Sequence, residues 1–198
     1  ALDRLEISDV TALTFPVEIT EPRNIDKEAG SDAVHQGVMI EADPLTAKGL
    51  SELTDTSLVL VLDQVTDPHN VGAVMRSAVA FGAGALITTN RHSPQESGVL
   101  AKAASGALEL IPHLEVRNLA DSLGELAALG FQTIGLDSEG SVELEQSMNA
   151  QKIALVLGAE GKGLRQKTRE TVATLARIDM PGIIKSLNVS NAAALSLY

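Results

Sequence analysis

The sequence feature that most constrains the fold is a series of short, nearly continuous apolar runs. SLVLVLDQV at 57–65 is the first, and ALITT at 85–89 and KIALVLG at 152–158 have the same character. FQTIGLD at 131–137 and ARIDM at 176–180 are two further runs of strand length. Strands that are buried on both faces, as in a parallel sheet, read in this way. We therefore predict buried parallel strands at these five places.

Helical patterns separate these runs. VGAVMRSAVAFGA predicts a helix that begins near Val71 and ends at Gly82 or Gly84, and LADSLGELAALG predicts another over 119–130. LRQKTRETVATL at 164–175 predicts a basic helix. Strands that alternate with helices indicate an α/β domain with a mostly parallel sheet and flanking helices, in which ligands lie beyond the carboxyl ends of the strands.

The first part of the chain has a different character. Residues 1–45 are rich in Asp and Glu and contain prolines, and only LTFPVEIT at 13–20 has the alternation of a short strand. We interpret 1–45 as the tail of an upstream domain with its linker, and 46–198 as a separate α/β domain. On this interpretation, the natural protein is expected to extend further at its N-terminus.

Charge and composition limit the possible partners. The net charge of −11 disfavours non-specific binding of a polyanion, so binding of nucleic acid requires local basic surface. Lys162, Arg165, Lys167 and Arg169 form such a cluster. Arg165 and Arg169 are spaced i, i+4 on the predicted helix, which would let both reach one phosphate track; a solvated helix face is the alternative.

Other classes of function are disfavoured by what the sequence lacks. There is no cysteine, which excludes disulfides and thiolate ligands, and an aromatic content of 2% argues against a base-stacking surface. The four histidines are scattered, so we predict no metal site. No apolar run has the length of a membrane span and no signal peptide opens the sequence, so a cytoplasmic protein without a membrane partner is expected.

Three loops rich in glycine and small polar residues follow predicted strands: TDPHN at 66–70, GAEGKG at 158–163 and PGIIKSLNVSN at 181–191. The second fits neither a P-loop nor a dinucleotide-binding fingerprint. A tight turn would explain its glycines but not Glu160 among them. Asn70 has a simpler interpretation as the N-cap of the helix that follows it, and Arg76 as a surface side chain of that helix.

Taken together, these loops carry a resemblance to a known family. DPHNVGAVMRSAVAFGA, LVLGAEGKGL and IDMPGIIKSLNVSNAAALSLY occur in this order, and each follows a strand. They resemble the three motifs of the SpoU-type RNA ribose 2′-O-methyltransferases. VHQG at 34–37 resembles the segment that joins the RNA-binding and catalytic domains in the ribosomal-RNA guanosine branch. The chain departs from the family in ending before the usual acidic residue after the last helix, and in having Asn191 where a branched apolar residue is common.

The resemblance implies a fold and a cofactor. The family has an α/β sheet with a C-terminal trefoil knot, works as a homodimer and binds S-adenosylmethionine in a bent form; here the sheet would follow the remnant of a small N-terminal RNA-binding domain. The resemblance thus implies that 1–45 is the tail of an N-terminal substrate-binding domain and that 46–198 is the catalytic domain. SLNVSN would be the loop that wraps the cofactor. Gly158, Ile178 and Leu187 are the implied cofactor contacts, and a side chain at Gly158 is expected to fill the space where the backbone meets the adenine.

The resemblance also implies catalytic roles, because methyl transfer to a ribose hydroxyl requires positioning of the 2′-oxygen and removal of its proton. It gives Arg76 the catalytic position, surrounded by Asn70, Glu160, Ser186 and Asn188. An arginine scarcely deprotonates, so we expect Arg76 to fix the nucleotide phosphate and polarise the hydroxyl. The proton would leave to a phosphate oxygen, to Glu160 or to water.

Three functions remain compatible with the sequence. The favoured one is an S-adenosylmethionine-dependent enzyme that methylates the 2′-hydroxyl of a guanosine in ribosomal RNA. The second is a transfer-RNA ribose methyltransferase of the same superfamily. The third is a non-catalytic RNA-binding protein that has kept the fold, and the presence of Asn70, Arg76, Glu160 and Asn188 argues against it.

Overall fold

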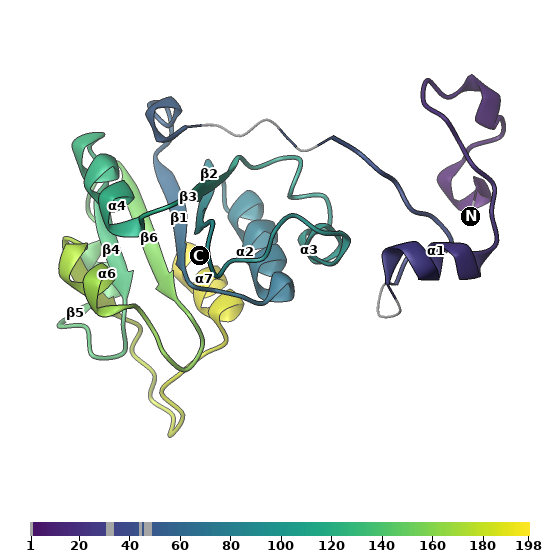
Figure 1. The fold of residues 1–198 in the computed structure, drawn as a ribbon. Coiled ribbons are helices and arrows are strands. Elements are labelled where there is room, and N and C mark those ends of the chain that lie inside the picture. Colours follow the sequence, from purple (N-terminus) through teal and green to yellow (C-terminus); the bar gives the residue numbers. More distant parts are fainter. Residues whose placement is uncertain (1, 31–33, 44, 46–48) are drawn as a thin grey trace. The chain divides into compact units, whose positions relative to one another are not determined.

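The protein is described by a computed structural model that covers residues 2–30, 34–43, 45 and 49–198 (Figure 1). It divides into two compact units, Ala1–Pro44 and Leu45–Tyr198. None of the helices formed by the described residues has the length and hydrophobicity needed to cross a membrane.

The first unit has little regular structure in its described part. It contains two 3-10 helices, η1 (Leu2–Leu5) and η2 (Val10–Ala12), and one α-helix, α1 (Pro22–Ala29), which has no buried residue. The strand expected over 13–20 is wrong, because these residues form no strand. Pro16 lacks the N–H that a sheet ladder needs, and the described residues of this unit form no strand that could pair with the segment. 

The second unit is built on a parallel sheet. Its described residues form seven strands in the order β3-β2-β1-β6-β4-β7-β5, and every neighbouring pair is parallel. The strands are β1 (Leu58–Asp63), β2 (Ala85–Thr89), β3 (His113–Val116), β4 (Gln132–Leu136), β5 (Val142–Glu143), β6 (Ile153–Gly158) and β7 (Thr174–Arg177). The predicted α/β class with a parallel sheet is confirmed.

Helices cover both faces of this sheet (Figure 1). Helices α2 (Pro68–Ala80), α3 (Gly98–Ala104) and α7 (Val189–Leu197) pack on one face, and α4 (Leu119–Ala128), α6 (Gln166–Thr171) and the 3-10 helix η3 (Leu50–Glu52) pack on the other. A single turn, α5 (Leu144–Ser147), follows β5. 

The central strand shows why the apolar runs are continuous. Leu60 and Leu62 of β1 belong to the core beneath α2 and α7, whereas Val59 and Val61 belong to the core beneath α4. Both faces of the strand are therefore buried, so the strand needs apolar residues at every position.

Two helices differ from their predicted bounds. Helix α2 begins at Pro68, and its N-cap is Asp67, whose carboxylate accepts a hydrogen bond from the His69 backbone N–H at 2.9 Å. Proline is favoured in the first helical turn because its missing N–H has no partner there in any case. Asn70 is therefore not the N-cap of this helix, and its side chain is free for another role.

Helix α6 has six residues, fewer than the predicted 164–175, and strand β7 begins at Thr174, earlier than the predicted Ala176. The Ala173 N–H donates to the backbone carbonyl and to the hydroxyl of Thr133 on β4, at 3.0 and 2.9 Å. These contacts draw the chain into the sheet, so the β-branched residues Val172 and Thr174 leave the helix.

Candidate functional site

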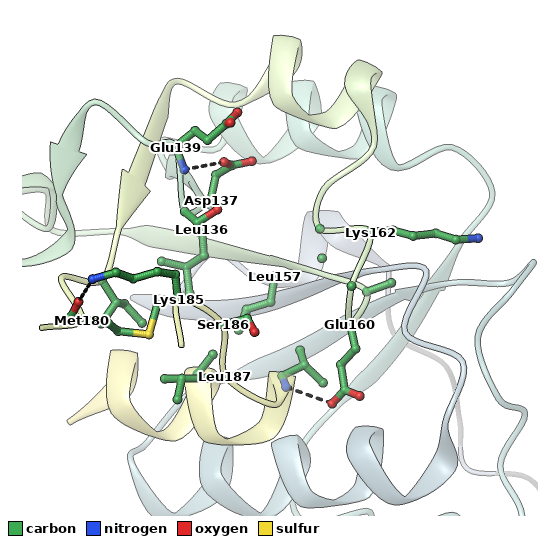
Figure 2. A pocket seen from close by; sticks show the side chains of 18 of the residues that line it. Leu136, Asp137, Glu139, Leu157, Glu160, Lys162, Met180, Lys185, Ser186 and Leu187 are labelled. Atoms are coloured by element: carbon green, nitrogen blue, oxygen red, sulfur yellow. Dashed lines mark hydrogen bonds between the residues drawn. The ribbon is translucent and has the colours of Figure 1, made fainter. Parts of the chain in front are cut away.

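A cavity of about 290 Å³ lies beyond the carboxyl ends of β6, β4 and β7 (Figure 2). It is lined by residues of three segments, 136–139 at the end of β4, 157–163 at the end of β6 and part of 178–192 between β7 and the first turn of α7, and by Arg169 of α6. Gly158, Ile178 and Leu187, the three predicted cofactor contacts, all line it. This is the edge at which parallel α/β sheets bind ligands.

The loop after β6 is held in a tight shape by its glycines. Gly163 donates its N–H to the Ala159 carbonyl at 2.8 Å, and Gly161 and Gly163 have φ values of 75° and 64°. A Cβ at Gly158 would lie 2.1 Å from the carbonyl carbon of Gly163. The glycine at 158 is thus required by the close approach of the two ends of its own loop, and the loop presents Glu160 at its outer side.

Glu160 joins the three loops. Its Oε1 accepts hydrogen bonds from Asn70 Nδ2 at 3.2 Å, from the Val189 backbone N–H at 3.2 Å, and from Asn188 Nδ2. Asn188 Nδ2 also donates to Asn70 Oδ1 at 2.9 Å. Figure 2 shows the Glu160 carboxylate directed at the start of α7. A carboxylate is favourable there, because the first N–H groups of a helix are unsatisfied and carry partial positive charge.

The polar residues of SLNVSN have separate tasks. Asn188 is the N-cap of α7, and its Oδ1 accepts hydrogen bonds from the Ser190 and Asn191 backbone N–H groups at 2.9 and 3.4 Å. Its amide nitrogen binds Glu160 and Asn70 instead. Ser186 lines the cavity. The hydroxyl of Ser190 also donates to Asn188 Oδ1, at 2.5 Å. The cap therefore uses Asn188 Oδ1, while Ser186 and the amide nitrogen of Asn188 are directed to the cavity and to Glu160.

Arg76 lies apart from this group. It is on α2, six residues after Asn70, which places it about 9 Å further along the helix axis and on a different face. Its side chain is exposed, does not line the cavity, and makes no hydrogen bond or ion pair with a residue that the structure describes. Within one chain, Asn70, Glu160, Ser186 and Asn188 come together, and Arg76 does not join them.

The basic cluster of 162–169 is arranged differently from the expectation. Arg165 is the N-cap of α6, and its Nε is 2.6 Å from Oδ1 of the fully buried Asp63 at the end of β1. Arg169 forms an ion pair with Asp137, just after β4, whose side chain is 6% exposed. The two arginines are therefore each tied to a different strand end, and the prediction that both lie on one face of the helix is wrong.

The sequence did not reveal the roles of Asp137, which lines the cavity, and of Asp63, which holds the loop that follows Gly163. Each stands at or just after the last residue of a buried strand, and a basic helix start follows Gly163 in the sequence. That placement was a usable signal, because the carboxyl ends of parallel strands lie at one edge of the sheet, here β1 and β4 on either side of β6. Within the described ranges, no group of three or more His, Asp or Glu residues is arranged to hold a metal ion.

The fold and the cavity together define the class of protein: an α/β protein with a cavity beyond the carboxyl ends of its parallel strands, beside a glycine-rich loop. Residues 57–198 match the SpoU rRNA Methylase family. The chain therefore belongs to the SpoU rRNA methylase family.

Curated relatives are similar over most of the chain. One is the 23S rRNA (guanosine-2′-O-)-methyltransferase RlmB of Ralstonia nicotianae, 46% identical over 175 residues, which are 86% of this chain and 70% of the relative. Another is the protein of the same name from Pseudomonas putida, 41% identical over 202 aligned residues, covering 98% of this chain and 82% of the relative.

Solved structures share the fold. The SpoU methyltransferase AviRb of Streptomyces viridochromogenes superposes with a TM-score of 0.70 at 26% identity, over 78% of this chain and 63% of that one. Its complex with the cofactor AdoMet superposes with a TM-score of 0.65 at 29% identity, over 72% of this chain and 56% of that one. In both comparisons the chain spans less than two thirds of the solved structure's length. The cofactor of this family is S-adenosylmethionine.

Proposed function

We propose that the chain is an S-adenosylmethionine-dependent methyltransferase that modifies the ribose 2′-hydroxyl of a guanosine in ribosomal RNA. Family membership over 57–198 supports the methyltransferase class. Relatives named as 23S rRNA guanosine 2′-O-methyltransferases, at up to 46% identity, support the substrate. The observation that carries the proposal is the convergence of three distant loops on Glu160 beside the cavity.

The cavity fits S-adenosylmethionine in chemistry. Ile178 and Leu187 give it apolar walls suited to an adenine, and the glycines at 158, 161 and 163 present backbone to it. Ser186 and the polar segment 136–139 supply groups for the ribose and amino-acid portions. When bound, the cofactor supplies an activated methyl group on a sulfonium, so the protein has to position the acceptor hydroxyl and remove its proton.

Glu160 is the proposed acceptor of the hydroxyl proton, or the group that orients the acceptor. Its Oε1 already receives three hydrogen bonds, which fix the orientation of the carboxylate. Its Oε2 makes no hydrogen bond to a residue in the described ranges, which leaves it available to the substrate. Asn70 and Asn188 are then positioning residues, because they hold Glu160 and lie within hydrogen-bonding distance of each other.

Arg76 is the proposed contact for the nucleotide phosphate. An exposed guanidinium without a partner among the described residues is suited to bind an anion from outside the chain, and its planar fork matches a phosphate group. In the proposed homodimer, Arg76 would complete a site that one chain leaves incomplete. Exposed apolar residues near the cavity support self-association: Ile183 is 99% exposed, Ile184 76% and Leu195 52%.

Several further features belong to the same proposal. The crevice would be closed by a trefoil knot, which is supported by the way 157–163 and 178–192 line one cavity. Residues 1–45 would be the tail of an RNA-binding domain and 46–198 the catalytic domain. The division of the chain into Ala1–Pro44 and Leu45–Tyr198 is compatible with that boundary. A ribosomal-RNA substrate agrees with the cytoplasmic localisation expected from the sequence.

A transfer-RNA ribose methyltransferase is the second candidate. Its support is the similarity to a structure titled for 2-OH methylation of C/U34 on tRNA, with a TM-score of 0.64 at 25% identity. The higher identity and coverage of the ribosomal-RNA relatives favour the first candidate. A non-catalytic RNA-binding protein is disfavoured by the presence of Asn70, Arg76, Glu160 and Asn188.

The deciding experiment offers two unmodified RNA substrates to the purified protein with S-adenosylmethionine labelled in its methyl group. We expect label to enter a 23S rRNA transcript at a guanosine ribose, located by mass spectrometry of nuclease fragments, and not to enter a pool of transfer-RNA transcripts. Labelling of transfer RNA alone would select the second candidate. Cofactor binding in calorimetry without methylation of either RNA would select the non-catalytic one.

A further inference from the structure

A second cavity, of about 370 Å³, lies beyond the neighbouring strands β2 and β3 and is lined by Asn90, Arg91 and Arg117. Arg91 follows β2 by two residues and Arg117 follows β3 by one. The Asn90 N–H donates to the Val116 carbonyl at 2.9 Å, so the two strand ends remain joined up to the mouth of the cavity.

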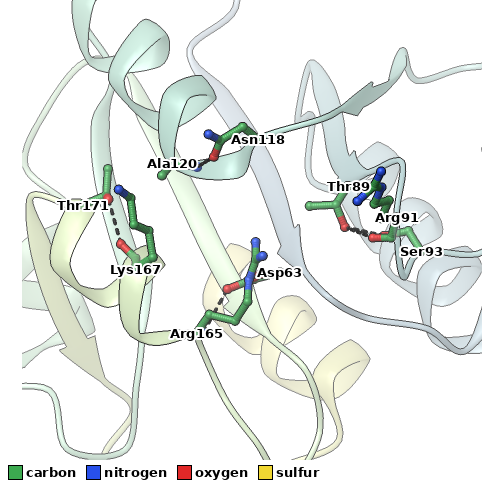
Figure 3. Close-up of polar contacts among 9 residues, drawn as sticks. All are labelled: Asp63, Thr89, Arg91, Ser93, Asn118, Ala120, Arg165, Lys167 and Thr171. Atoms are coloured by element: carbon green, nitrogen blue, oxygen red, sulfur yellow. Dashed lines mark hydrogen bonds and ion pairs between the residues drawn. The ribbon is translucent and has the colours of Figure 1, made fainter.

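The backbone that carries Arg91 is held rigidly (Figure 3). The hydroxyl of Thr89 donates to the Arg91 carbonyl at 2.6 Å and lies 3.3 Å from the hydroxyl of Ser93. Thr89 is 4% exposed, and His92 has a φ of 66°, which completes the tight turn. The turn fixes the point from which the Arg91 side chain extends, while that side chain itself is exposed.

The backbone that carries Arg117 is held by the start of α4. The next residue, Asn118, is the N-cap of this helix, with its Oδ1 accepting from the Ala120 N–H at 3.1 Å and its Nδ2 donating to Asp121 Oδ2 at 2.6 Å. The start of α4 also contributes the positive end of a helix dipole beside an already cationic side chain.

Arg91 and Arg117 share a place beside one cavity and have no carboxylate partner among the described residues. In a chain with 26 Asp and Glu against 15 Lys and Arg, a nearby carboxylate can neutralise an arginine. Arg165, Arg169 and Arg177 all form ion pairs. Among the residues that the structure describes, neither Arg91 nor Arg117 forms one, although both line the same cavity. An unneutralised pair of guanidinium groups on an acidic protein is suited to an external anion.

The sheet order connects this cavity to the site already described. Strands β3, β2, β1 and β6 are neighbours, so the carboxyl edge carries in turn Arg117, Arg91, the Asp63–Arg165 pair and the Glu160 loop. Adjacent strands are about 4.8 Å apart, so the arc from β3 to β1 spans roughly 10 Å. Arg165 binds Asp63 through Nε, and its side chain is 42% exposed, which leaves its terminal nitrogens near solvent. A chain of phosphates along this edge would lead to the cofactor cavity.

We propose that Arg91 and Arg117, extended by Arg165, form a track that binds the sugar-phosphate backbone of the substrate RNA beside the target nucleotide. This inference rests on the proposed RNA substrate and adds the surface that positions it. Contacts to phosphates position an RNA without reading its sequence, and arginine suits them because its planar fork can make two hydrogen bonds to one phosphate.

The test uses the full chain with Arg91→Gln and Arg117→Gln combined, and an unmodified 23S rRNA transcript as the probe in filter binding across a salt series. We expect affinity to fall roughly tenfold or more, and the slope of log affinity against log salt to become shallower by about 1.5, since each phosphate contact contributes about 0.7–0.9. Affinity for S-adenosylmethionine should not change, because neither arginine lines the cofactor cavity.

Two control variants complete the test. The combined Arg91→Lys and Arg117→Lys variant keeps the charge and should keep most of the salt slope. Lys102→Gln removes one positive charge from α3, which packs on the face of the sheet opposite to α4. This variant should leave RNA affinity unchanged. RNA affinity and salt slope equal to those of the wild type in the double Gln variant would overturn the proposal. That result does not depend on methyl transfer, so it is distinguishable from a failure of the proposed activity.

Discussion

Asp63 and Arg165 lie 102 residues apart in the sequence and form an ion pair with 2.6 Å between Oδ1 and Nε. The carboxylate is fully buried and also accepts the Arg165 backbone N–H at 3.0 Å, while the arginine side chain is 42% exposed. The pair attaches the end of the Glu160 loop to the end of β1. It therefore supports the candidate site from a position outside both cavities.

The two partners should differ in what their removal costs. Arg165→Ala leaves a buried carboxylate with a single backbone partner, and we expect it to lower the free energy of unfolding by about 3 kcal/mol. Asp63→Asn leaves an arginine that can turn to water, and its amide oxygen can still accept the backbone N–H, so we expect a loss of about 1 kcal/mol. Urea denaturation measures both, with Lys167→Ala, an exposed residue of α6, as the control. Equal losses in the two variants would show that the unequal burial of the two side chains does not determine the cost of removing each one.

Glu160→Gln separates the chemical role of the carboxylate from its structural role. A glutamine can present its oxygen to the three donors that Oε1 now serves, so thermal stability and cofactor affinity should change little. If the carboxylate receives the hydroxyl proton, the rate of methyl transfer should fall on the order of 100-fold, within the range typical of general base catalysis. Single-turnover assays at saturating RNA give this rate.

The variants Glu160→Ala and Asn70→Ala serve as comparisons for the single-turnover assay of Glu160→Gln. Glu160→Ala removes the acceptor for Val189 at the start of α7, so it should lower stability as well as rate. Asn70→Ala removes one donor and leaves the carboxylate, so it should reduce the rate less than Glu160→Gln does. A Glu160→Gln enzyme with unchanged single-turnover rate would assign proton removal to a phosphate oxygen or water.

Gly158→Ala should weaken the binding of S-adenosylmethionine by roughly tenfold or more, through the shape of the loop. A Cβ at this position would lie 2.1–2.3 Å from backbone atoms of Gly163 and Leu164, so the loop cannot keep its present closure. The sequence-based expectation that a side chain here would fill the space beside the adenine gave a different reason for the same loss. Calorimetry measures the affinity. Gly182→Ala is the matched control, because nothing lies within 4 Å of a Cβ there. Equal affinity in the two variants would contradict the role given to Gly158.

The strands could be predicted where burial on both faces left a simple pattern. The predicted strand ALITT coincides with β2, and the apolar runs around β1 and β6 gave those strands to within a few residues. Helix α3 and strand β3 were not predicted, because they are short and their apolar residues show no extended period. Helix α3 depends on tertiary packing, since a Cβ at Gly72 of α2 would lie 2.6 Å from Ala103.

Only part of the candidate site could be predicted from the sequence, and the reason is physical. Glycine-rich loops at strand ends can be read from sequence, because glycine is required wherever φ is positive or two backbones approach closely. The partners of Glu160 cannot be read from the sequence, because Asn70 and Asn188 lie 90 and 28 residues away from it. The same applies to Arg165 and Arg169, where the i, i+4 spacing suggested one helix face and two buried carboxylates determined the outcome.

His113 should make stability depend on pH. Burial lowers the pKa of this imidazole below its ordinary 6.5, and the nearby carboxylates of Glu115 and Glu96 offset part of the effect. The folded protein therefore binds fewer protons than the unfolded chain, and stability present above about pH 6.5 is lost as the pH falls below it. Melting temperatures of the wild type should fall more steeply between pH 7 and about pH 5 than those of His113→Gln. Parallel curves for the two proteins would exclude His113 as a cause.

Arg76→Ala should retain the fold and the affinity for S-adenosylmethionine but lose methyl transfer on the order of 100-fold or more. The side chain is exposed and contributes nothing to the core, so its removal should not change the melting temperature. It does not line the cofactor cavity, so calorimetry with the cofactor should also be unchanged.

Arg76→Lys decides whether geometry or charge accounts for that loss. A lysine keeps the positive charge but cannot make the two parallel hydrogen bonds that a guanidinium makes to a phosphate, so we expect methyl transfer to remain low in this variant too. A role limited to surface charge predicts near-normal turnover for Lys and at most a mild loss for Ala. Lys167→Ala, which removes an exposed cation from α6, supplies the reference for that mild loss. Turnover of both Arg76 variants near this reference would remove Arg76 from the site and leave Glu160, Asn70 and Asn188 as its polar centre.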